Sequence, residues 1–154
     1  MGTRSRIGVM HGDNCKSVYC HWDGYLEHNG RILLEYFDSA LANHLVALGD
    51  LSSLAPKIGE KHDFDDREAC EGICNFYGRD RGETGTEFKT DDTFAKFLER
   101  ADGCGAEFYY IMRDGVWYCG TTYGSDTALG GKLVPLAEAL ADQHIENAET
   151  VSAE

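Results

Sequence analysis

Two short stretches near the start of the chain alternate apolar residues with small or polar ones. They span residues 4–11 and 15–22, and the sequence Gly-Asp-Asn at 12–14 separates them. A period of two is typical of strands that bury one face, and the segment between them has the composition of a turn. We therefore predict a hairpin, which ends at Asp23-Gly24.

Apolar residues recur at helical spacing in four segments, which are residues 29–37, 38–48, 90–103 and 135–145. The first three begin with Asn29, Asp38 and Thr90, whose side chains can accept hydrogen bonds from the free amides of a first helical turn. Gly49 and Gly103 stand at the ends of two of these segments, and glycine commonly ends a helix. We predict a helix in each segment.

Further strands are predicted between and after these helices. Residues 73–78 have the composition of a short strand, while 106–112 and 116–122 flank Asp114-Gly115, a dipeptide that favours a two-residue hairpin turn. We predict loops in the segments without a regular period, which are residues 51–59, 60–71 and 79–90. The acidic segment 60–71 is the best candidate for a mobile surface loop.

The predicted order of elements is β-β-α-α-β-α-β-β-α. Hairpins rather than strict βαβ alternation favour an α+β fold, with a mostly antiparallel sheet of about five strands and helices packed on one face. With 154 residues the chain has room for one domain, which we predict to span 1–148 and to leave a frayed tail at 149–154. The predicted core consists of Ile7, Val9, Val18, Leu33, Phe37, Leu41, Leu45, Phe94, Phe97, Leu98, Ile111 and Leu140.

The chain is strongly acidic, with a formal net charge of -13 at pH 7. Residues 60–92 carry eleven acidic and five basic residues, and residues 135–154 carry five acidic residues and no basic one. This charge disfavours direct binding to nucleic acid or to an anionic membrane, because both are themselves anionic. The acidity either serves solubility or forms a face, including Asp63, Asp65 and Asp66, that docks on a basic partner.

No apolar run in the sequence approaches the roughly 20 residues that span a bilayer. The basic start of the chain is followed by only a short apolar stretch at 7–10, far less than the apolar region of a secretory signal. We therefore expect a cytoplasmic protein.

The six cysteines stand at positions 15, 20, 70, 74, 104 and 119. None of them forms the Cys-x-x-Cys pair that structural zinc sites commonly use, and a reducing cytosol disfavours disulfides. We interpret Cys20 and Cys119 as small core residues and expect no metal and no cofactor. Metal binding and redox chemistry remain the alternatives.

The densest cluster of reactive side chains is Tyr-Cys-His-Trp-Asp-Gly-Tyr at 19–25. His21 and Asp23 would share one face of a strand, so that the carboxylate can orient the imidazole for general-base chemistry. In the alternative, Trp22 and Tyr25 pack against the edge of the core while Asp23-Gly24 forms the turn.

A second dense motif is Arg-Asp-Arg-Gly-Glu at 79–83. Arg79 and Arg81 can clamp a phosphate or carboxylate through paired hydrogen bonds. The alternative is an internal cluster of ion pairs, with Asp80 and Glu83, that holds its own loop.

The two motifs can form one site if the strand at 73–78 lies near the strand at 15–22. Their following loops then meet at one edge of the sheet and form a cationic pocket lined by aromatic side chains. The sequence contains no phosphate-binding loop, nucleophile elbow or His-Glu-x-x-His motif, so no complete catalytic motif accompanies this pocket. We therefore assign no catalytic residue.

Three motifs occur in a recognisable order, namely Cys-His-Trp-Asp-Gly-Tyr at 20–25, Leu-Gly-Asp-Leu-Ser at 48–52 and the motif at 79–83. With them, over about residues 4–120, the chain resembles a family of small, mostly uncharacterised proteins of bacteriophages and integrated mobile elements. The resemblance implies an accessory protein that blocks a defence system of the bacterial host.

Two functions follow as hypotheses. The first is a non-enzymatic inhibitor of the anti-CRISPR or anti-restriction type, which binds a basic host defence protein through acidic surfaces. The second is a sponge or hydrolase for a small nucleotide-type immune signal. In the second, the arginines of 79–83 hold the anionic group, Trp22 or Tyr25 stacks on the base, and His21 with Asp23 acts on it.

Overall fold

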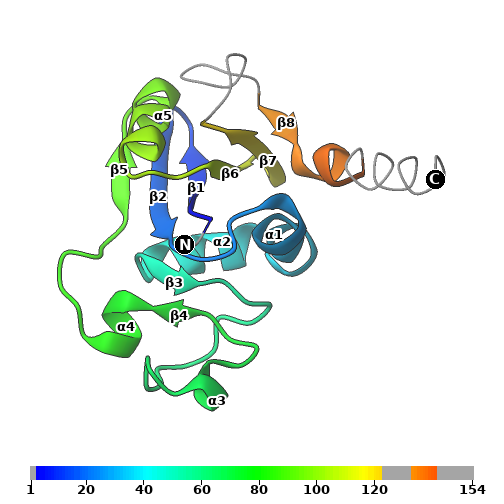
Figure 1. The fold of residues 1–154 in the computed structure, drawn as a ribbon. Helices are drawn as coiled ribbons and strands as arrows, with labels where there is room; N and C mark the ends of the chain where they lie inside the picture. Colours follow the sequence, from blue (N-terminus) through cyan, green and yellow to red (C-terminus); the bar gives the residue numbers. More distant parts are fainter. Residues whose placement is uncertain (1–2, 123–132, 142–154) are drawn as a thin grey trace.

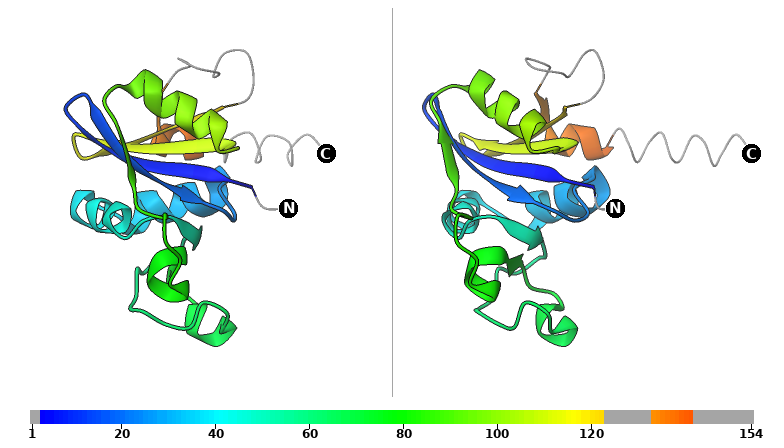
Figure 2. Two further views of the ribbon diagram at one scale, coloured as in Figure 1. Left: turned by 90° about the vertical axis from the view of Figure 1, so that its left-hand side faces the viewer. Right: turned by 60° about the vertical axis from the view of Figure 1, so that its left-hand side comes forward.

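A computed structural model describes residues 3–122 and 133–141 of the chain. A central sheet of eight strands has helices on both of its faces (Figures 1 and 2). The first two strands form the predicted hairpin, in which Ile7 lies opposite Val18. The hairpin around Asp114-Gly115 is also confirmed, and both turn residues have positive φ angles, 51° and 79°.

The strand order is β4-β3-β2-β1-β6-β7-β8, and β5 pairs with β2 beside this path. The strands are β1 (Ser5–His11), β2 (Asn14–Cys20), β3 (Leu51–Ser53), β4 (Asn75–Phe76), β5 (Lys89–Asp91), β6 (Phe108–Arg113), β7 (Val116–Thr121) and β8 (Val134–Pro135). The pairs β1–β6 and β2–β3 are parallel, and the other pairs are antiparallel. The α+β class is confirmed, but the sheet is mixed and larger than predicted. Several of its strands are too short to show alternation. Strand β3 lies in a segment predicted as a loop, and β5 spans the boundary between a predicted loop and a predicted helix.

The described helical segments are η1 (Leu26–Gly30), α1 (Arg31–Tyr36), α2 (Ser39–Ala47), α3 (Arg67–Cys70), α4 (Tyr77–Arg81) and α5 (Phe94–Gly103). Residues 136–141 are also helical; the rest of the predicted last helix, and the tail, lie outside the described residues. Asp38 caps α2 as predicted, since its carboxylate accepts a hydrogen bond from the Leu41 amide at 2.9 Å. Helix α5 begins after Thr93 rather than at Thr90, because Thr90 is part of β5 and pairs with β2.

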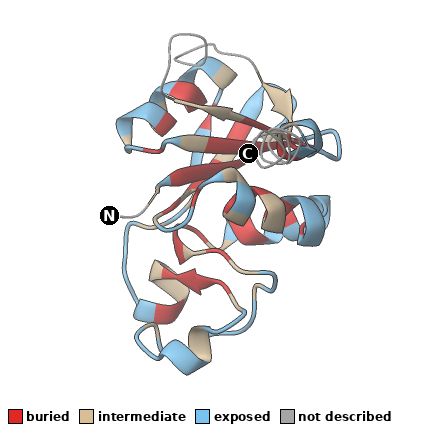
Figure 3. Cartoon of the chain, turned by 45° about the vertical axis from the view of Figure 1, so that its right-hand side comes forward, coloured by how far each residue is buried: buried red, intermediate tan, exposed pale blue. Residues whose placement is uncertain are grey.

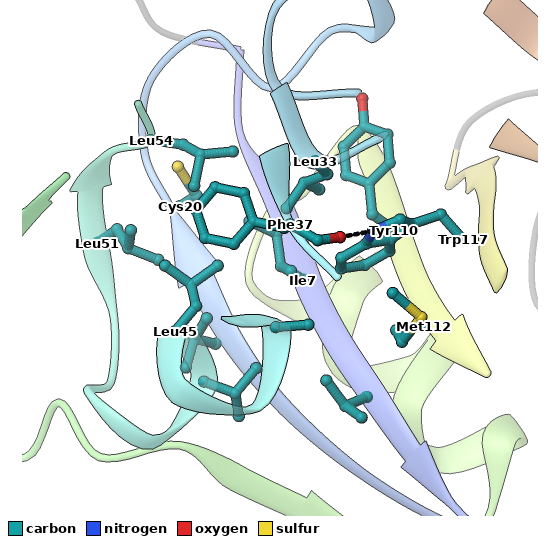
Figure 4. Close-up of a cluster of buried hydrophobic side chains, with 14 of the residues drawn as sticks. Ile7, Cys20, Leu33, Phe37, Leu45, Leu51, Leu54, Tyr110, Met112 and Trp117 are labelled. Carbon is teal, nitrogen blue, oxygen red and sulfur yellow. Dashed lines mark hydrogen bonds between the residues drawn. The ribbon is translucent and has the colours of Figure 1, made fainter. Parts of the chain in front are cut away.

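Each face of the sheet has its own apolar cluster, so the prediction of helices on one face was wrong. Side chains of α1 and α2 pack on the face that carries Ile7 and Tyr110 (Figure 4). On this face the Trp117 indole donates a hydrogen bond to the Phe37 carbonyl at 2.8 Å. Helix α5 packs on the opposite face, against Cys15, Tyr109 and Ile111. Alternation along the strands is the physical reason, because a central strand that buries both faces needs cover on both sides.

Ten of the twelve predicted core residues are buried. Figure 3 shows buried residues along the strands of the central sheet. Leu41 is instead 42% exposed on α2, and Phe94 is only partly buried at the edge of the α5 cluster. Helix α2 is nine residues long and buries a narrow face through Ala42, Leu45 and Val46, which leaves Leu41 on its outer side.

The elements β3, α3, β4 and α4 extend from one end of the sheet as a smaller lobe (Figure 1). In sequence this lobe contains the acidic segment, residues 60–71, and the motif at 79–83. Within the described part of the chain, no helix combines the length and apolar character needed to cross a bilayer.

Candidate functional site

The acidic segment is held in place by Asp80, the central residue of the motif at 79–83. The side chain of Asp80 is fully buried. One of its carboxylate oxygens accepts hydrogen bonds from Arg79 Nε at 2.9 Å and from the His62 amide at 3.1 Å. The other accepts hydrogen bonds from the Phe76 amide at 2.8 Å and from Arg79 Nη2 at 3.2 Å. A single carboxylate therefore connects the acidic segment, β4 and α4.

The environment of Asp80 favours its charged form. Burial by itself raises the pKa of this carboxyl, but the hydrogen bonds from Arg79 and from the Phe76 and His62 amides outweigh burial and lower the pKa below its ordinary value. A carboxyl whose pKa is lower in the folded state stabilises the fold above its unfolded pKa and ceases to do so as the pH falls through the folded value.

We therefore expect the acidic segment to loosen in acid. The Phe64 amide donates to the Asp80 carbonyl, and the Cys74 amide donates to the Lys57 carbonyl. Hydrogen exchange at these two amides, corrected for the intrinsic exchange rate, should accelerate as the pH falls below about 4. In an Asp80→Asn variant the corrected rate should lose this pH dependence. A dependence that persists in the variant would show that other carboxyl groups control the segment.

Arg79 is engaged inside the lobe through all three nitrogens of its guanidinium group. Besides Asp80, it donates to the backbone carbonyls of Gly59 at 2.9 Å, Ile58 at 3.1 Å and Cys74 at 3.0 Å. The same group lies 4.6 Å from the centre of the Phe76 ring. These contacts favour the alternative in which Arg79 holds its own loop, because they leave its donors committed to the chain.

His62 and Asn75 provide the second anchor of the acidic segment. His62 Nε2 lies 3.0 Å from Asn75 Oδ1, and its Nδ1 lies 2.9 Å from the Glu60 carbonyl. Asn75 Nδ2 donates to the Phe64 carbonyl at 3.2 Å. Sequence analysis did not select either residue. The signal for His62 was its position inside a strongly charged segment, and the sequence offered none for Asn75.

Phe64 connects the acidic segment to α4 through an aromatic stack. The rings of Phe64 and Tyr77 stack with their centres 5.5 Å apart, and the Arg81 guanidinium lies 4.7 Å from the centre of the Phe64 ring. Arg81 also forms an ion pair with Glu83 at 2.7 Å, and both side chains are largely exposed.

The carboxylates predicted to form the acidic surface remain at the surface. Asp63, Asp65 and Asp66 are all exposed. Asp66 also caps α3 by accepting hydrogen bonds from the amides of Glu68 and Ala69, and Asp63 accepts one from the Asp65 amide. These local bonds fix the backbone while the negative charges still face solvent.

The motif at 19–25 has a different geometry from the one predicted. His21 Nδ1 lies 2.7 Å from the Tyr19 hydroxyl, so this hydroxyl, and not Asp23, orients the imidazole. Asp23 has a φ of 57° and forms the turn with Gly24, as the alternative interpretation proposed. Trp22 and Tyr25 are each 43% exposed, so they do not pack into the core edge.

The backbone of this turn is fixed by two buried side chains. Asn29 donates to the Trp22 carbonyl at 3.4 Å, and the Tyr110 hydroxyl donates to the Gly24 carbonyl. Asn29 was predicted to cap a helix; it is fully buried and also donates to Ser5 Oγ at 3.2 Å. The tertiary contacts of Asn29 therefore replace the capping role that its sequence position predicted.

The two motifs follow strands that are not direct neighbours in the sheet. Strand β4 pairs with β3, and β3 lies between β4 and β2, so residues 75–76 do not pair directly with residues 14–20. The common pocket stays a prediction. Among the described residues, no hydrogen bond or ion pair joins the 19–25 motif to the 79–83 motif.

All six cysteines are free thiols. Cys20 and Cys119 are buried as predicted, and burial raises the pKa of the Cys20 thiol to about 12. A thiol of this kind is a poor nucleophile and a poor metal ligand at neutral pH, because both roles require the thiolate. No cluster of three metal-ligating side chains occurs in the part of the chain that the structure describes.

Comparisons of the chain with protein-family models, with curated proteins and with solved structures gave no match.

Proposed function

We propose that the protein is a non-enzymatic binding protein that engages a basic surface of a partner protein through the acidic segment. The observation that carries this proposal is the combination of exposed carboxylates with a backbone anchored by Asp80, Arg79 and His62. A charged surface held in one conformation loses little conformational entropy on binding. It also steers an oppositely charged partner toward the complex.

The partner that we propose is a host defence protein whose own function depends on a basic surface, such as a nuclease of a restriction or CRISPR system. A surface that normally binds nucleic acid attracts carboxylates for the same electrostatic reason that it attracts phosphates. The net charge of -13 supports this choice. The protein would then act in the cytoplasm of the bacterial host.

The second hypothesis, a nucleotide sponge or hydrolase built on Arg79 and Arg81, has less support. Arg79 donates to Asp80 and to three backbone carbonyls, and Arg81 pairs with Glu83. A ligand would have to displace these internal contacts. We therefore favour the binding protein.

Two charge-reversed triple variants test the proposed surface. In the lobe variant, lysine replaces three exposed acids of the acidic segment whose side chains form no hydrogen bond or ion pair among the described residues: Asp65, Glu68 and Glu71. In the control variant, lysine replaces three exposed acids on and after α5, which changes the net charge equally: Glu99, Asp102 and Glu107.

Each variant is expressed in bacteria that carry a restriction or CRISPR system, and the plating efficiency of a targeted phage is measured. We expect the parent and the control variant to restore plating, whereas the lobe variant fails while keeping the parent melting temperature. Equal activity of the two variants, or equal loss in both, would show that the acidic segment is not the interaction surface.

A further inference from the structure

A buried arginine lies on the sheet face that carries α5, near the C-terminal end of that helix. Arg6 in β1 is 4% exposed. Its Nε donates to Ser17 Oγ at 2.8 Å, and its Nη2 donates to the Ser17 carbonyl at 3.3 Å. Within residues 3–122 and 133–141, its Nη1 reaches only the sulfur of Cys104, at 4.0 Å. All of these partners are neutral.

Among the described residues, no carboxylate forms an ion pair with Arg6. This distinguishes it from Arg79 and Arg100, which both pair with a buried aspartate. A buried charge without a counter-charge is unfavourable, so such a group is normally paired. Asp50 is close enough for the Arg6 charge to act on it, but burial dominates there and raises the pKa of that carboxyl. One Asp50 oxygen bonds to the Tyr19 amide instead.

Polar groups gather around this guanidinium. The strand register places Tyr19 of β2 directly opposite Arg6, and the Tyr19 hydroxyl is the group that holds the His21 ring. Burial raises the pKa of Tyr19, while the positive charge of Arg4 acts in the opposite direction, which places Arg4 within electrostatic range of the phenol. Arg4 is exposed, and its guanidinium extends over Gly105, where it would lie 3.0 Å from an added Cβ.

The C-terminal end of α5 does not by itself explain why Arg4 and Arg6 lie beside it. The negative end of a helix dipole attracts cations, and this contributes to their placement. However, the terminal carbonyls of Arg100, Ala101 and Asp102 already accept backbone hydrogen bonds from residues 104–106. The two guanidinium groups are therefore not needed to satisfy these carbonyls.

We propose that Arg4, Arg6, Tyr19 and His21 form a binding site for a small phosphate-bearing anion. The forked donors of arginine match the geometry of phosphate oxygens, and the anion supplies a counter-charge that no described residue gives Arg6 through an ion pair. The Trp22 ring, 43% exposed and 4.8 Å from the His21 ring, is an aromatic surface beside the site on which a nucleotide base can stack. This site goes beyond the proposed function, because it uses none of the residues of the acidic segment.

The overall negative charge of the protein limits the places where an added phosphate can bind. At physiological ionic strength, charges more than about 10 Å apart are largely screened, so a local pair of arginines can bind an anion that the rest of the surface repels. Non-specific binding of phosphate elsewhere on this surface is disfavoured, because the excess of carboxylates repels the anion at short range. Phosphate-dependent changes should therefore be confined to the site.

Inorganic phosphate is titrated into the full chain at constant ionic strength, and backbone amide chemical shifts are followed. We expect saturable shifts at Arg6, Cys104 and Gly105. Arg4→Gln should weaken phosphate binding by at least about tenfold, the equivalent of one charge-assisted hydrogen bond. The matched control is Arg67→Gln, since Arg67 is also an exposed arginine but lies on α3. It should leave the affinity unchanged.

Arg6→Met adds a test from inside the site. Replacing a buried charge by an apolar side chain of similar volume is often neutral for stability, so we expect a folded protein that has lost the phosphate response. Because Arg4 is exposed, Arg4→Gln decides the matter if Arg6→Met does not fold. The absence of saturable shifts in the parent, or an equal effect of Arg67→Gln, would overturn the proposal.

AMP as a second probe separates a phosphate site from a nucleotide site. Tighter binding of AMP than of phosphate, with the difference lost in Trp22→Ala, would assign a nucleotide. Equal affinity of the two probes would assign the phosphate group alone. Both outcomes support the site, whereas a failure of both probes to bind contradicts it, independently of the result for the acidic segment.

Discussion

Replacing Phe97 by alanine is expected to lower the free energy of unfolding by about 3–5 kcal/mol, because the change removes a large buried side chain and leaves a cavity. Phe97 is fully buried on α5, with its ring centre 5.8 Å from the ring centres of both Phe94 and Tyr109. A domain of this size is typically stable by about 5–15 kcal/mol, so the loss is a large share of the total. Urea denaturation measures it directly.

Leu41→Ala is the matched comparison for Phe97→Ala. Leu41 was predicted to belong to the core, but it is 42% exposed on α2, so its truncation should change the stability by no more than about 1 kcal/mol. If instead the Phe97→Ala variant melts within about two degrees of the parent, α5 does not pack on the sheet as described.

Arg79→Ala is the second substitution with a large expected effect. The change removes the partner of the buried Asp80 carboxylate and frees three backbone carbonyls. Removing one member of a buried ion pair typically costs about 3–5 kcal/mol, because the other charge is left without compensation. We expect the lobe that contains β4 and α4 to lose its protection from hydrogen exchange, with a corresponding drop in the urea midpoint.

Arg81→Ala serves as the control at the other end of the same motif. The Arg81 side chain is 46% exposed and pairs with the exposed Glu83, so its removal should cost at most about 1 kcal/mol. From the sequence, both arginines have the same two possible roles, which are anion binding and an internal cluster of ion pairs. The structure leads to different expectations for the two. If the two variants are equally stable, Arg79 does not hold the lobe together, and the prediction that both arginines bind an anion is favoured.

Local patterns determined much of the local structure. Alternation of apolar residues was sufficient for the first hairpin, and the positive φ angles that Asp114-Gly115 adopt explain why this dipeptide marks the second one. The apolar spacing of α5 predicted its buried face, and Asp38 its helix cap. These features depend on residues that are neighbours in the sequence, so the local sequence is sufficient to predict them.

The candidate sites were predictable only as lists of reactive residues. His21, Asp80 and three acids of the acidic segment, Asp63, Asp65 and Asp66, were selected, but their partners were not. Tyr19 holds His21, and Asp80 holds the backbone amide of His62, eighteen positions away in the sequence. Which donor meets which acceptor depends on how the strands are ordered, and short strands such as β3 and β4 have no pattern that determines their order.

The sequence alone thus determined the fold class, the strong negative charge and the elements with a clear period. Only the tertiary structure decided that helices cover both faces of the sheet, that Arg79 is engaged inside its own lobe and that Arg6 is buried without a carboxylate partner among the described residues. The physical reason is the range of the interactions. Periodicity and capping act within a few residues, whereas burial and charge pairing are set by contacts between segments that lie far apart in the chain.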